Sequence, residues 1–333
     1  MKNSTVEVIG EIGVNHNGSL RKAKKLIKLA KNSGFNFVKF QTFKTHNMIK
    51  TNTPLLSYQK NHKFASQYKL LKKLELSEEQ HKKILQYCKI QKIKFLSTPF
   101  DIESCRFLKK LGLKIIKISS GDINNYPLLL EVSKFAKKVI LSTGMSTLIE
   151  IKNAIKILKK KKLKDKNIKI LHCTSSYPVQ FRDANLLAIS FLKKKLKNDI
   201  GFSDHTLGKE AAVAAVALGA VIIEKHITLN KKLFGPDHKA SLEPKEFFDF
   251  IKSIRIAKQL LGIEKKFITS IEKNNKKLIR RSIVAKNFIK EGDKFTENNI
   301  ICKRPEGGMS PIYWNKILGK IAKKNYQIDQ FIK

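Results

Sequence analysis

Short runs of apolar and β-branched residues alternate along most of the chain with longer segments of helical periodicity. The strand-like runs lie at 6–14, 35–43, 93–99, 115–120, 138–143, 168–174, 200–205 and 221–228. Helical segments lie between most of them, at 20–32, 77–91, 102–111, 148–159 and 209–218. This alternation is typical of parallel βαβ units, and eight strands is the number that closes a (β/α)8 barrel. We therefore predict an α/β barrel; the alternative is a doubly wound open sheet, which the lack of a GxGxxG turn after the first strand disfavours.

One connection is too long for a simple loop between a strand and a helix. It runs over residues 44–76 and contains Tyr58, Tyr68 and several polar residues. Long loops in compact domains are usually functional or disordered. We expect this one to lie over the mouth of the barrel as part of the site.

The pattern of alternating strands and helices ends after residue 261. A charged stretch is followed by short, turn-rich elements at 281–285 and 300–304, with a turn around Gly292 between them. This pattern is typical of a compact β-rich module. We predict a barrel domain over 1–265, a linker over 266–279 and a small β-rich domain over 280–333.

The composition fits a folded protein with a substantial core. The hydrophobic fraction is 42%, and no apolar run is long enough to span a membrane. The first residues lack the features of a signal peptide, so we expect a cytoplasmic protein. The four cysteines are widely separated and show no CxxC spacing. That pattern predicts a reduced compartment without a disulfide framework.

The formal net charge of +41 raises the question of a nucleic-acid or membrane partner. Of the 68 basic residues only seven are arginines, although arginine is the side chain whose planar fork suits base readout and phosphate clamps. The lysines are scattered over predicted helix faces, for example Lys22, Lys25 and Lys28. We interpret the charge as a solvated surface that helps to attract anionic substrates, and we expect neither partner. A distant alternative is a basic nucleic-acid-binding protein whose barrel has lost its enzymatic activity. Such a protein would bind nucleic acid tightly at physiological salt.

Polar side chains gather at the carboxyl ends of the predicted strands, where the residues of a barrel converge on one mouth. In strand order they are Glu11, Asn15, His16, Lys39, Gln41, Ser97, Thr98, Lys117, Ser119, Ser120, Ser142, Thr143, His172, Thr174, Ser175, Ser203, Asp204, His205, Glu224 and His226. Two lysines with a ring of serines and threonines supply the cations and short donors that a phosphate and a carboxylate require. We therefore predict an anion-binding site at the mouth.

The histidines of this set divide into two groups. His205 and His226 fall at the ends of neighbouring predicted strands and suit a divalent metal with positions open for substrate. His16 and His172, each taken alone, are better interpreted as hydrogen-bonded core residues. The run SDH at 203–205 is not a hydrolase triad, because adjacent residues on a strand point to opposite faces.

Seven motifs, taken in order, resemble those of the sialic acid synthase family. They are EIGVNHNG (11–18), KFQT (39–42), STPF (97–100), LSTGM (141–145), SDH (203–205), EKH (224–226) and GPDH (235–238). No single four-residue match is decisive, but the ordered set is highly specific and covers nearly the whole chain. The carboxyl-terminal module, with Arg281, Ser282 and KRP at 303–305, resembles the antifreeze-like SAF domain of that family.

The resemblance implies a (β/α)8 barrel followed by a SAF domain, in a domain-swapped homodimer whose small domains cap the partners' barrels. It implies the condensation of phosphoenolpyruvate with an N-acetylmannosamine-type aldehyde sugar, which gives a nine-carbon keto acid and phosphate. The enzyme would be a transferase of the N-acetylneuraminate or legionaminic acid synthase type. A divalent metal is expected on His205 and His226, with manganese first and magnesium or cobalt as alternatives.

By the same resemblance, the other site residues divide by substrate. The residues expected to be catalytic are Glu11, Lys117 and Glu224. Phosphoenolpyruvate would be bound by Lys39, Thr98, Lys117, Ser120, Ser142 and Ser203. The sugar would be handled by Glu11, Gln41, Tyr177, Glu224 and Asp237, with Asp122 and Ser175 also in the substrate pocket. Arg304 of the partner subunit would reach the sugar.

Two departures from the family pattern concern the sugar rather than the reaction. Asp122 stands where family members commonly carry glutamate, and the run CTSSY at 173–177 differs from the sialic and legionaminic patterns. The stretch 235–244 looks most like the legionaminic and bacterial sialic branches. A pseudaminic acid synthase is the alternative, disfavoured by the GVNH form of the first motif. The remaining rival is another metal-dependent barrel that condenses phosphoenolpyruvate with a different aldehyde sugar.

Overall fold

The computed structural model describes residues 5–55, 64–161 and 163–333. The chain forms two compact units, Met1–Gly262 and Ile263–Lys333. The sequence prediction ended the barrel at residue 265 and began the small domain at 280. Within the described ranges, no helix is both long and apolar enough to cross a membrane.

The first unit is built on an eight-stranded parallel sheet that confirms the predicted barrel. Its strands are β1 (Glu7–Gly13), β2 (Phe37–Thr42), β3 (Lys94–Pro99), β4 (Ile115–Ile118), β5 (Lys138–Ser142), β6 (Ile168–His172), β7 (Asp199–Asp204) and β8 (Ile222–His226). The hydrogen-bonded order is β3-β2-β1-β8-β7-β6-β5-β4. β3 and β4, the two ends of this order, lie next to each other, so the sheet closes on itself.

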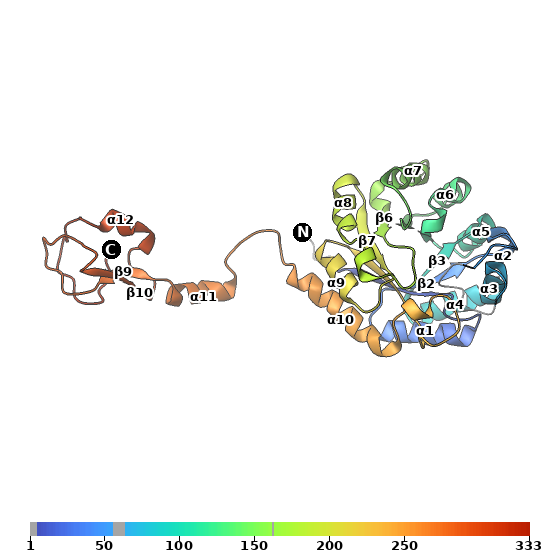
Figure 1. The fold of residues 1–333 in the computed structure, drawn as a ribbon, viewed down its shortest axis with the longest axis horizontal. Helices are drawn as coiled ribbons and strands as arrows, with labels where there is room; N and C mark the ends of the chain where they lie inside the picture. Colours follow the sequence, from blue (N-terminus) through green and yellow to red (C-terminus); the bar gives the residue numbers. More distant parts are fainter. Residues whose placement is uncertain (1–4, 56–63, 162) are drawn as a thin grey trace. The chain divides into compact units, whose positions relative to one another are not determined.

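Helices surround the strands, as the ribbon in Figure 1 shows. They are α1 (Leu20–Asn32), α4 (Glu78–Ile90), α5 (Ile102–Lys110), α6 (Tyr126–Ser133), α7 (Leu148–Leu158), α8 (Leu187–Lys195), α9 (Glu210–Ala217) and α10 (Pro244–Leu260). Their apolar faces cover the outer side chains of the strands in one continuous core. Local signals fix the helix starts; α4, for example, begins at a capping box of Ser77 and Gln80.

The inner side chains of the barrel form layers because strand residues alternate between the two faces. One interior layer is apolar: it consists of Ile9, Phe37, Leu96, Ile140, Leu171 and Ile222, with the partly buried Ile115 packed against them. β7 contributes Gly201 at this level, where a Cβ atom would come within 2.3 Å of a methyl carbon of Ile222. This packed floor closes the barrel from below, so the next layer toward the carboxyl ends forms the base of the mouth.

The long connection after β2 contains helices that the sequence analysis did not predict. These are α2 (Thr45–Met48) and α3 (Gln67–Leu74), and Glu75 accepts hydrogen bonds from both the amide and the hydroxyl of Thr45. The helices pack on Val14 and Phe43, which directly follow β1 and β2. The connection therefore lies at the mouth, as expected; Tyr58, however, falls outside the described residues.

The second unit contains α11 (Ser270–Ile279), the antiparallel pair β9 (Ser282–Ala285) and β10 (Ile300–Lys303), and α12 (Trp314–Ile317). Isolated bridges add to the pair, and a small core forms around Ile283, Phe295 and Tyr326. This confirms the β-rich module. α11 occupies most of the stretch predicted as a linker, and none of its residues is buried.

Candidate active site

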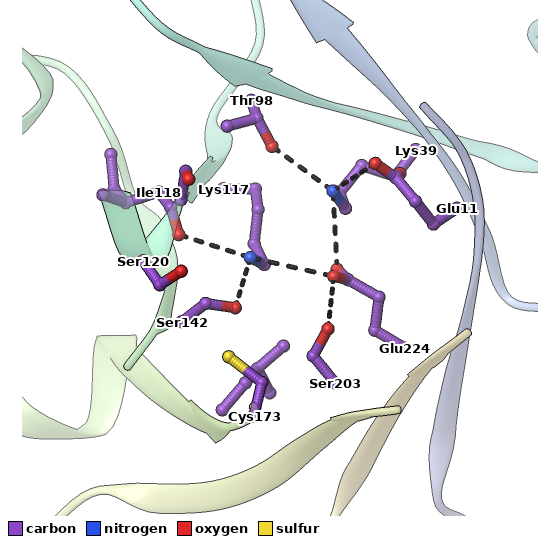
Figure 2. Close-up of polar contacts among 12 residues, drawn as sticks. Glu11, Lys39, Thr98, Lys117, Ile118, Ser120, Ser142, Cys173, Ser203 and Glu224 are labelled. Atoms are coloured by element: carbon purple, nitrogen blue, oxygen red, sulfur yellow. Dashed lines mark hydrogen bonds and ion pairs between the residues drawn. The ribbon is translucent and has the colours of Figure 1, made fainter. Parts of the chain in front are cut away.

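The second interior layer of the barrel is almost entirely polar. Each of its members lies two residues beyond the apolar layer: Glu11, Lys39, Thr98, Lys117, Ser142, Cys173, Ser203 and Glu224. All are buried. Strand alternation therefore brings side chains from seven strands to one level of the barrel, and Cys173 joins them directly after β6. Figure 2 shows how they cluster.

Two lysines and two glutamates form a continuous charged network in this layer. Lys39 Nζ lies 2.8 Å from Glu11 Oε1 and 3.7 Å from Glu224 Oε2. Lys117 Nζ lies 3.8 Å from Glu224 Oε1. Glu224 also accepts a hydrogen bond of 2.9 Å from Ser203 Oγ. The second carboxylate oxygens of Glu11 and Glu224 are buried without a hydrogen-bond partner among the described residues.

The network shifts the pKa values of the two carboxylates in opposite directions. Burial raises the pKa of Glu11, and the charge of Glu224 adds to this, although Lys39 opposes it. Burial also acts to raise the pKa of Glu224, but Lys117 and Lys39 outweigh it and lower that pKa below its usual value. Carboxylates whose environments differ in this way suit different roles in proton transfer. Glu11 is the one better placed to take up a proton, while Glu224 stays charged.

The pKa values of the two lysines are also shifted in opposite directions. Burial opposes the charged form of Lys39, but the carboxylates of Glu11 and Glu224 raise its pKa above the usual value. Burial lowers the pKa of Lys117 despite the attraction of Glu224. Lys117 donates to Ser142 Oγ at 2.6 Å, and Lys39 to Thr98 Oγ1 at 3.4 Å. These ammonium groups and hydroxyls form a concentrated donor set for an anion.

A pair of hydroxyls lies near the ends of β4 and β6. Ser120 begins the short 3-10 helix Ser120–Asp122 that follows β4, and Ser175 follows β6. Their Oγ atoms are 3.2 Å apart. Ser175 lies in the loop after β6, and its contact with Ser120 places it between the ends of β4 and β6.

The predicted metal ligands lie side by side. The ring centroids of His205 and His226 are 5.5 Å apart, and Tyr177 packs against both rings at 4.2 and 5.6 Å. His205 Nδ1 lies 2.8 Å from the carbonyl oxygen of Thr174, so it carries the proton and leaves a lone pair on Nε2. Burial lowers the pKa of His205 to about 4 and that of His226 well below its usual value. Both imidazoles are therefore neutral, the form that binds a metal.

Asp237 completes this part of the site. Its carboxylate lies 3.8 Å from Nδ1 of His226, an atom with no hydrogen-bond partner among the described residues. Burial raises the pKa of Asp237 to about 7, and the nearby charge of Glu11 adds to the effect. No group of three His, Cys, Asp or Glu side chains in the described part of the chain is arranged to hold a metal. Two neutral histidines still fit a divalent ion whose other ligands are substrate and water.

Three other predicted residues lie in different surroundings. Gln41 lies on the face of β2 that carries Lys39, one step nearer the mouth. Asp122 accepts a hydrogen bond from Asn125 at 3.1 Å, and burial raises its pKa to about 6, but it does not contact the charged network in the described structure. Arg304 belongs to the second unit, directly follows β10 and is exposed.

Several polar residues at the strand ends have structural roles. His16 accepts the amide hydrogen of Gly18, and His172 bonds to the carbonyl of Ala184, so the interpretation of both as core residues is confirmed. Asp204 points away from the barrel interior and pairs with Lys225 at 2.8 Å, with both side chains fully buried. The prediction that 203–205 is not a triad is therefore confirmed.

One member of the polar layer was not assigned a site role from the sequence. Cys173 was noted only as part of an unusual run. The signal that identifies it is its spacing of two from Leu171 on an inward-facing strand position, the same relation that links Ile9 to Glu11. Cysteine was overlooked because it counts as a small apolar residue in a pattern of hydrophobicity.

Comparisons with known proteins agree with this picture. The model of the NeuB family matches residues 26–266, and that of the SAF domain matches 280–333. The N,N'-diacetyllegionaminic acid synthase of Campylobacter jejuni is 48% identical over 98% of both chains. The protein of that name from Legionella pneumophila is 40% identical over 96% of this chain and 91% of its own. A crystal structure of the N-acetylneuraminic acid synthetase of Leptospira borgpetersenii, in complex with citrate, has a TM-score of 0.74 and 36% identity, and covers 82% of this chain and 90% of that one.

Proposed function

Because the chain belongs to the NeuB family and carries a SAF domain, we propose that it condenses phosphoenolpyruvate with an acetamido aldehyde sugar. The products are a nine-carbon keto acid of the sialic acid type and phosphate. The observation that carries this proposal is the buried network of Lys39, Lys117, Glu11 and Glu224 at the base of the barrel mouth. Lysines buried this deeply are costly unless an anion or a carboxylate balances them.

Phosphoenolpyruvate brings a phosphate and a carboxylate to this network. Lys39 and Lys117 supply the positive charge, and Thr98 and Ser142 already contact them. The hydroxyls of Ser120, Ser175 and Ser203 are the short donors around the phosphate. The cations and hydroxyls hold the substrate in one orientation, which converts an encounter of two molecules into a reaction within the site.

In this proposal the sugar binds next to His205, His226 and Asp237. The divalent metal that we propose on the two histidines, manganese before magnesium or cobalt, would polarise the aldehyde oxygen as a Lewis acid. Tyr177 packs against both imidazole rings and limits their movement. Gln41 and Asp122 are further donors and acceptors for the sugar's hydroxyl and acetamido groups.

The reaction forms one carbon–carbon bond, and it exchanges the carbon–oxygen bond to phosphate for a carbon–oxygen bond to water. The methylene carbon of phosphoenolpyruvate attacks the aldehyde carbon. The aldehyde oxygen becomes a hydroxyl by gaining one proton, which balances the proton released by the water that adds in the next step. Water adds to the carbon that bears the phosphate, and Glu11, whose pKa burial raises, takes up the proton that this water loses. The hydroxyl of the adduct then loses its proton to the departing phosphate, so the bond between the carbon and the phosphate oxygen breaks and the keto group remains. Glu224 stays ionised and stabilises the positive charge that develops on that carbon.

For the sugar, we propose the diacetamido precursor of legionaminic acid. The support is the level of identity: 48% and 40% to two diacetyllegionaminic acid synthases, against 36% to the human N-acetylneuraminate-9-phosphate synthase and 34% to a pseudaminic acid synthase of Campylobacter jejuni. In this proposal Asp122, which is shorter than glutamate by one methylene, would leave room for a bulkier substituent on the sugar.

We also propose that the enzyme works as a domain-swapped homodimer in the cytoplasm, where phosphoenolpyruvate is made. Exposed apolar side chains on α11, namely Ile271, Leu278 and Ile279, are better buried against a second subunit than left in water. Arg304 of the partner subunit would then reach the sugar. It is exposed and is one of only seven arginines, in a chain that uses lysine almost everywhere else.

The test is phosphate release from phosphoenolpyruvate in the presence of manganese. N-acetylmannosamine and the diacetamido precursors of legionaminic and pseudaminic acids are offered separately. We expect release with the legionaminic precursor at the highest kcat/KM. Highest activity with another of the three sugars would reassign the branch, and no release with any of them would overturn the proposed function.

A further inference from the structure

Cys173 is the one member of the polar layer for which the proposed reaction has no task. It follows β6, points into the barrel and is only 3% exposed. Burial raises the pKa of its thiol, although the charge of Lys117 opposes this effect. The thiol is therefore neutral and unsuited to nucleophilic chemistry. Figure 2 draws it in the same cluster as Lys117, Ser142 and Ser203.

The sulfur of Cys173 bonds to the neighbouring strand end. Cys173 Sγ accepts the backbone N–H of Gly144 at 3.1 Å. Gly144 forms part of the turn between β5 and α7, so this contact joins the carboxyl ends of β5 and β6. The amide is partly buried, and a buried amide without an acceptor is costly.

Gly144 is in turn wedged between the two hydroxyls at the neighbouring strand ends. A Cβ atom on this residue would lie 2.4 Å from Ser175 Oγ and 2.6 Å from both Ser120 Oγ and Ser120 Cβ. Its φ of +26° also disfavours any other residue. The turn therefore packs so closely against both serines that even one added carbon would collide with them, and a shift of the turn would change the space around their hydroxyls.

We propose that Cys173 is a positioning residue for phosphoenolpyruvate: its sulfur anchors the Gly144 turn, and the turn holds Ser120 and Ser175 in place as phosphate donors. Without the sulfur, the amide of Gly144 loses its acceptor and the turn is free to move away from the two hydroxyls. The inference rests on the proposed function, because it assigns the serine pair to the anion of that reaction.

The experiment compares three substitutions at this position with a matched control. Cys173→Ala removes the acceptor, Cys173→Val fills the space of the sulfur without accepting, and Cys173→Ser restores an acceptor. Cys105→Ala removes another fully buried thiol, on α5 outside the barrel. For each variant, steady-state kinetics give kcat and both KM values. Calorimetry with phosphoenolpyruvate and manganese, in the absence of sugar, gives the Kd.

We expect Cys173→Ala and Cys173→Val to raise the KM and Kd for phosphoenolpyruvate about 3- to 10-fold, the effect of losing one hydrogen bond. kcat and the KM for the sugar should change less than about twofold. Cys173→Ser should recover most of the affinity, because the hydroxyl can still accept the amide hydrogen. Cys105→Ala should lower the melting temperature and leave phosphoenolpyruvate binding unchanged.

Two results would overturn the inference: unchanged affinity in Cys173→Ala and Cys173→Val, or a serine variant no better than the alanine one. The second result would mean that the sulfur only fills space. Wild-type protein that binds phosphoenolpyruvate but releases no phosphate would overturn the proposed function alone, and the affinity ratios would still decide the role of Cys173. Wild-type protein that binds no phosphoenolpyruvate would overturn both.

Discussion

Substitution of Glu224 by glutamine isolates the charge at the centre of the network. The amide has the same shape and can still accept the hydrogen bond from Ser203, which is 2.9 Å long in the wild type. The change removes a negative charge that lies 3.7 Å from Lys39 and 3.8 Å from Lys117. At an effective dielectric constant of about 20, each attraction amounts to about 4 kcal/mol before desolvation is counted. Breaking a buried pair by removing one partner typically costs about 3–5 kcal/mol.

We therefore expect Glu224→Gln to lower the free energy of unfolding of the ligand-free protein by about 3–5 kcal/mol near pH 7. Lys39 keeps Glu11 as a partner, so Lys117 bears most of the loss. Burial already lowers the pKa of Lys117, and removing Glu224 lowers it further. A lysine whose pKa is lower in the folded state destabilises that state most when the pH is low. The deficit should therefore shrink as the pH rises toward 10.5, the ordinary pKa of a lysine.

Urea unfolding followed by circular dichroism measures this effect, with and without phosphoenolpyruvate. The matched control is Glu246→Gln, which neutralises a half-exposed carboxylate 2.8 Å from Lys231 and should cost less than about 1 kcal/mol. Phosphoenolpyruvate should restore part of the lost stability, because its charges replace that of Glu224 near the lysines. A loss below about 1 kcal/mol, or a deficit that grows with pH, would refute this electrostatic account.

Three further changes test other parts of the site. His226→Ala should abolish both metal-dependent turnover and the rise in melting temperature on adding manganese; if the manganese-induced shift persists, the metal site lies elsewhere. Arg304→Ala should raise the KM for the sugar at least about tenfold, whereas Lys303→Ala, a substitution of its exposed neighbour, should not. Equal effects of the two substitutions would contradict a specific contact between Arg304 and the sugar. Burial raises the pKa of Asp237 from 3.8 to about 7. Between these two pH values the folded protein retains a proton that the unfolded chain releases, so the free energy of unfolding falls as the pH rises from 3.8 to about 7. Asp237→Asn should therefore stabilise the metal-free protein at pH 8 by up to about 4 kcal/mol but not at pH 4, and equal stability of variant and wild type at pH 8 would contradict the raised pKa.

The barrel could be predicted because its signals are local. Runs such as 138–143 and 168–174 are apolar on both faces of the strand, as parallel strands covered by helices must be. Lys39 and Lys117 could be predicted to face the interior because charged side chains inside such runs are conspicuous. The helices α2 and α3 were missed because they are short, and packing on Val14 and Phe43 stabilises them more than any periodicity of their own.

Other features depend on contacts that no local pattern carries. The opposite pKa shifts of Glu11 and Glu224 arise from their distances to two lysines on different strands. Cys173 acts through Gly144, which is 29 residues away in the chain and carries no side chain to suggest the contact. Strand alternation predicts which residues share a layer of the barrel, but hydrogen bonds between adjacent strand ends depend on the final register of the sheet.

The most direct test of the account follows the bridging oxygen of phosphoenolpyruvate. The enzyme is incubated with manganese, the diacetamido precursor of legionaminic acid and phosphoenolpyruvate carrying ¹⁸O between carbon and phosphorus. The products are then analysed by mass spectrometry. Under the proposed mechanism we expect one labelled phosphate for each nine-carbon keto acid formed, because water adds to carbon and the carbon–oxygen bond breaks. Unlabelled phosphate, or phosphate released without a nine-carbon product, would contradict it.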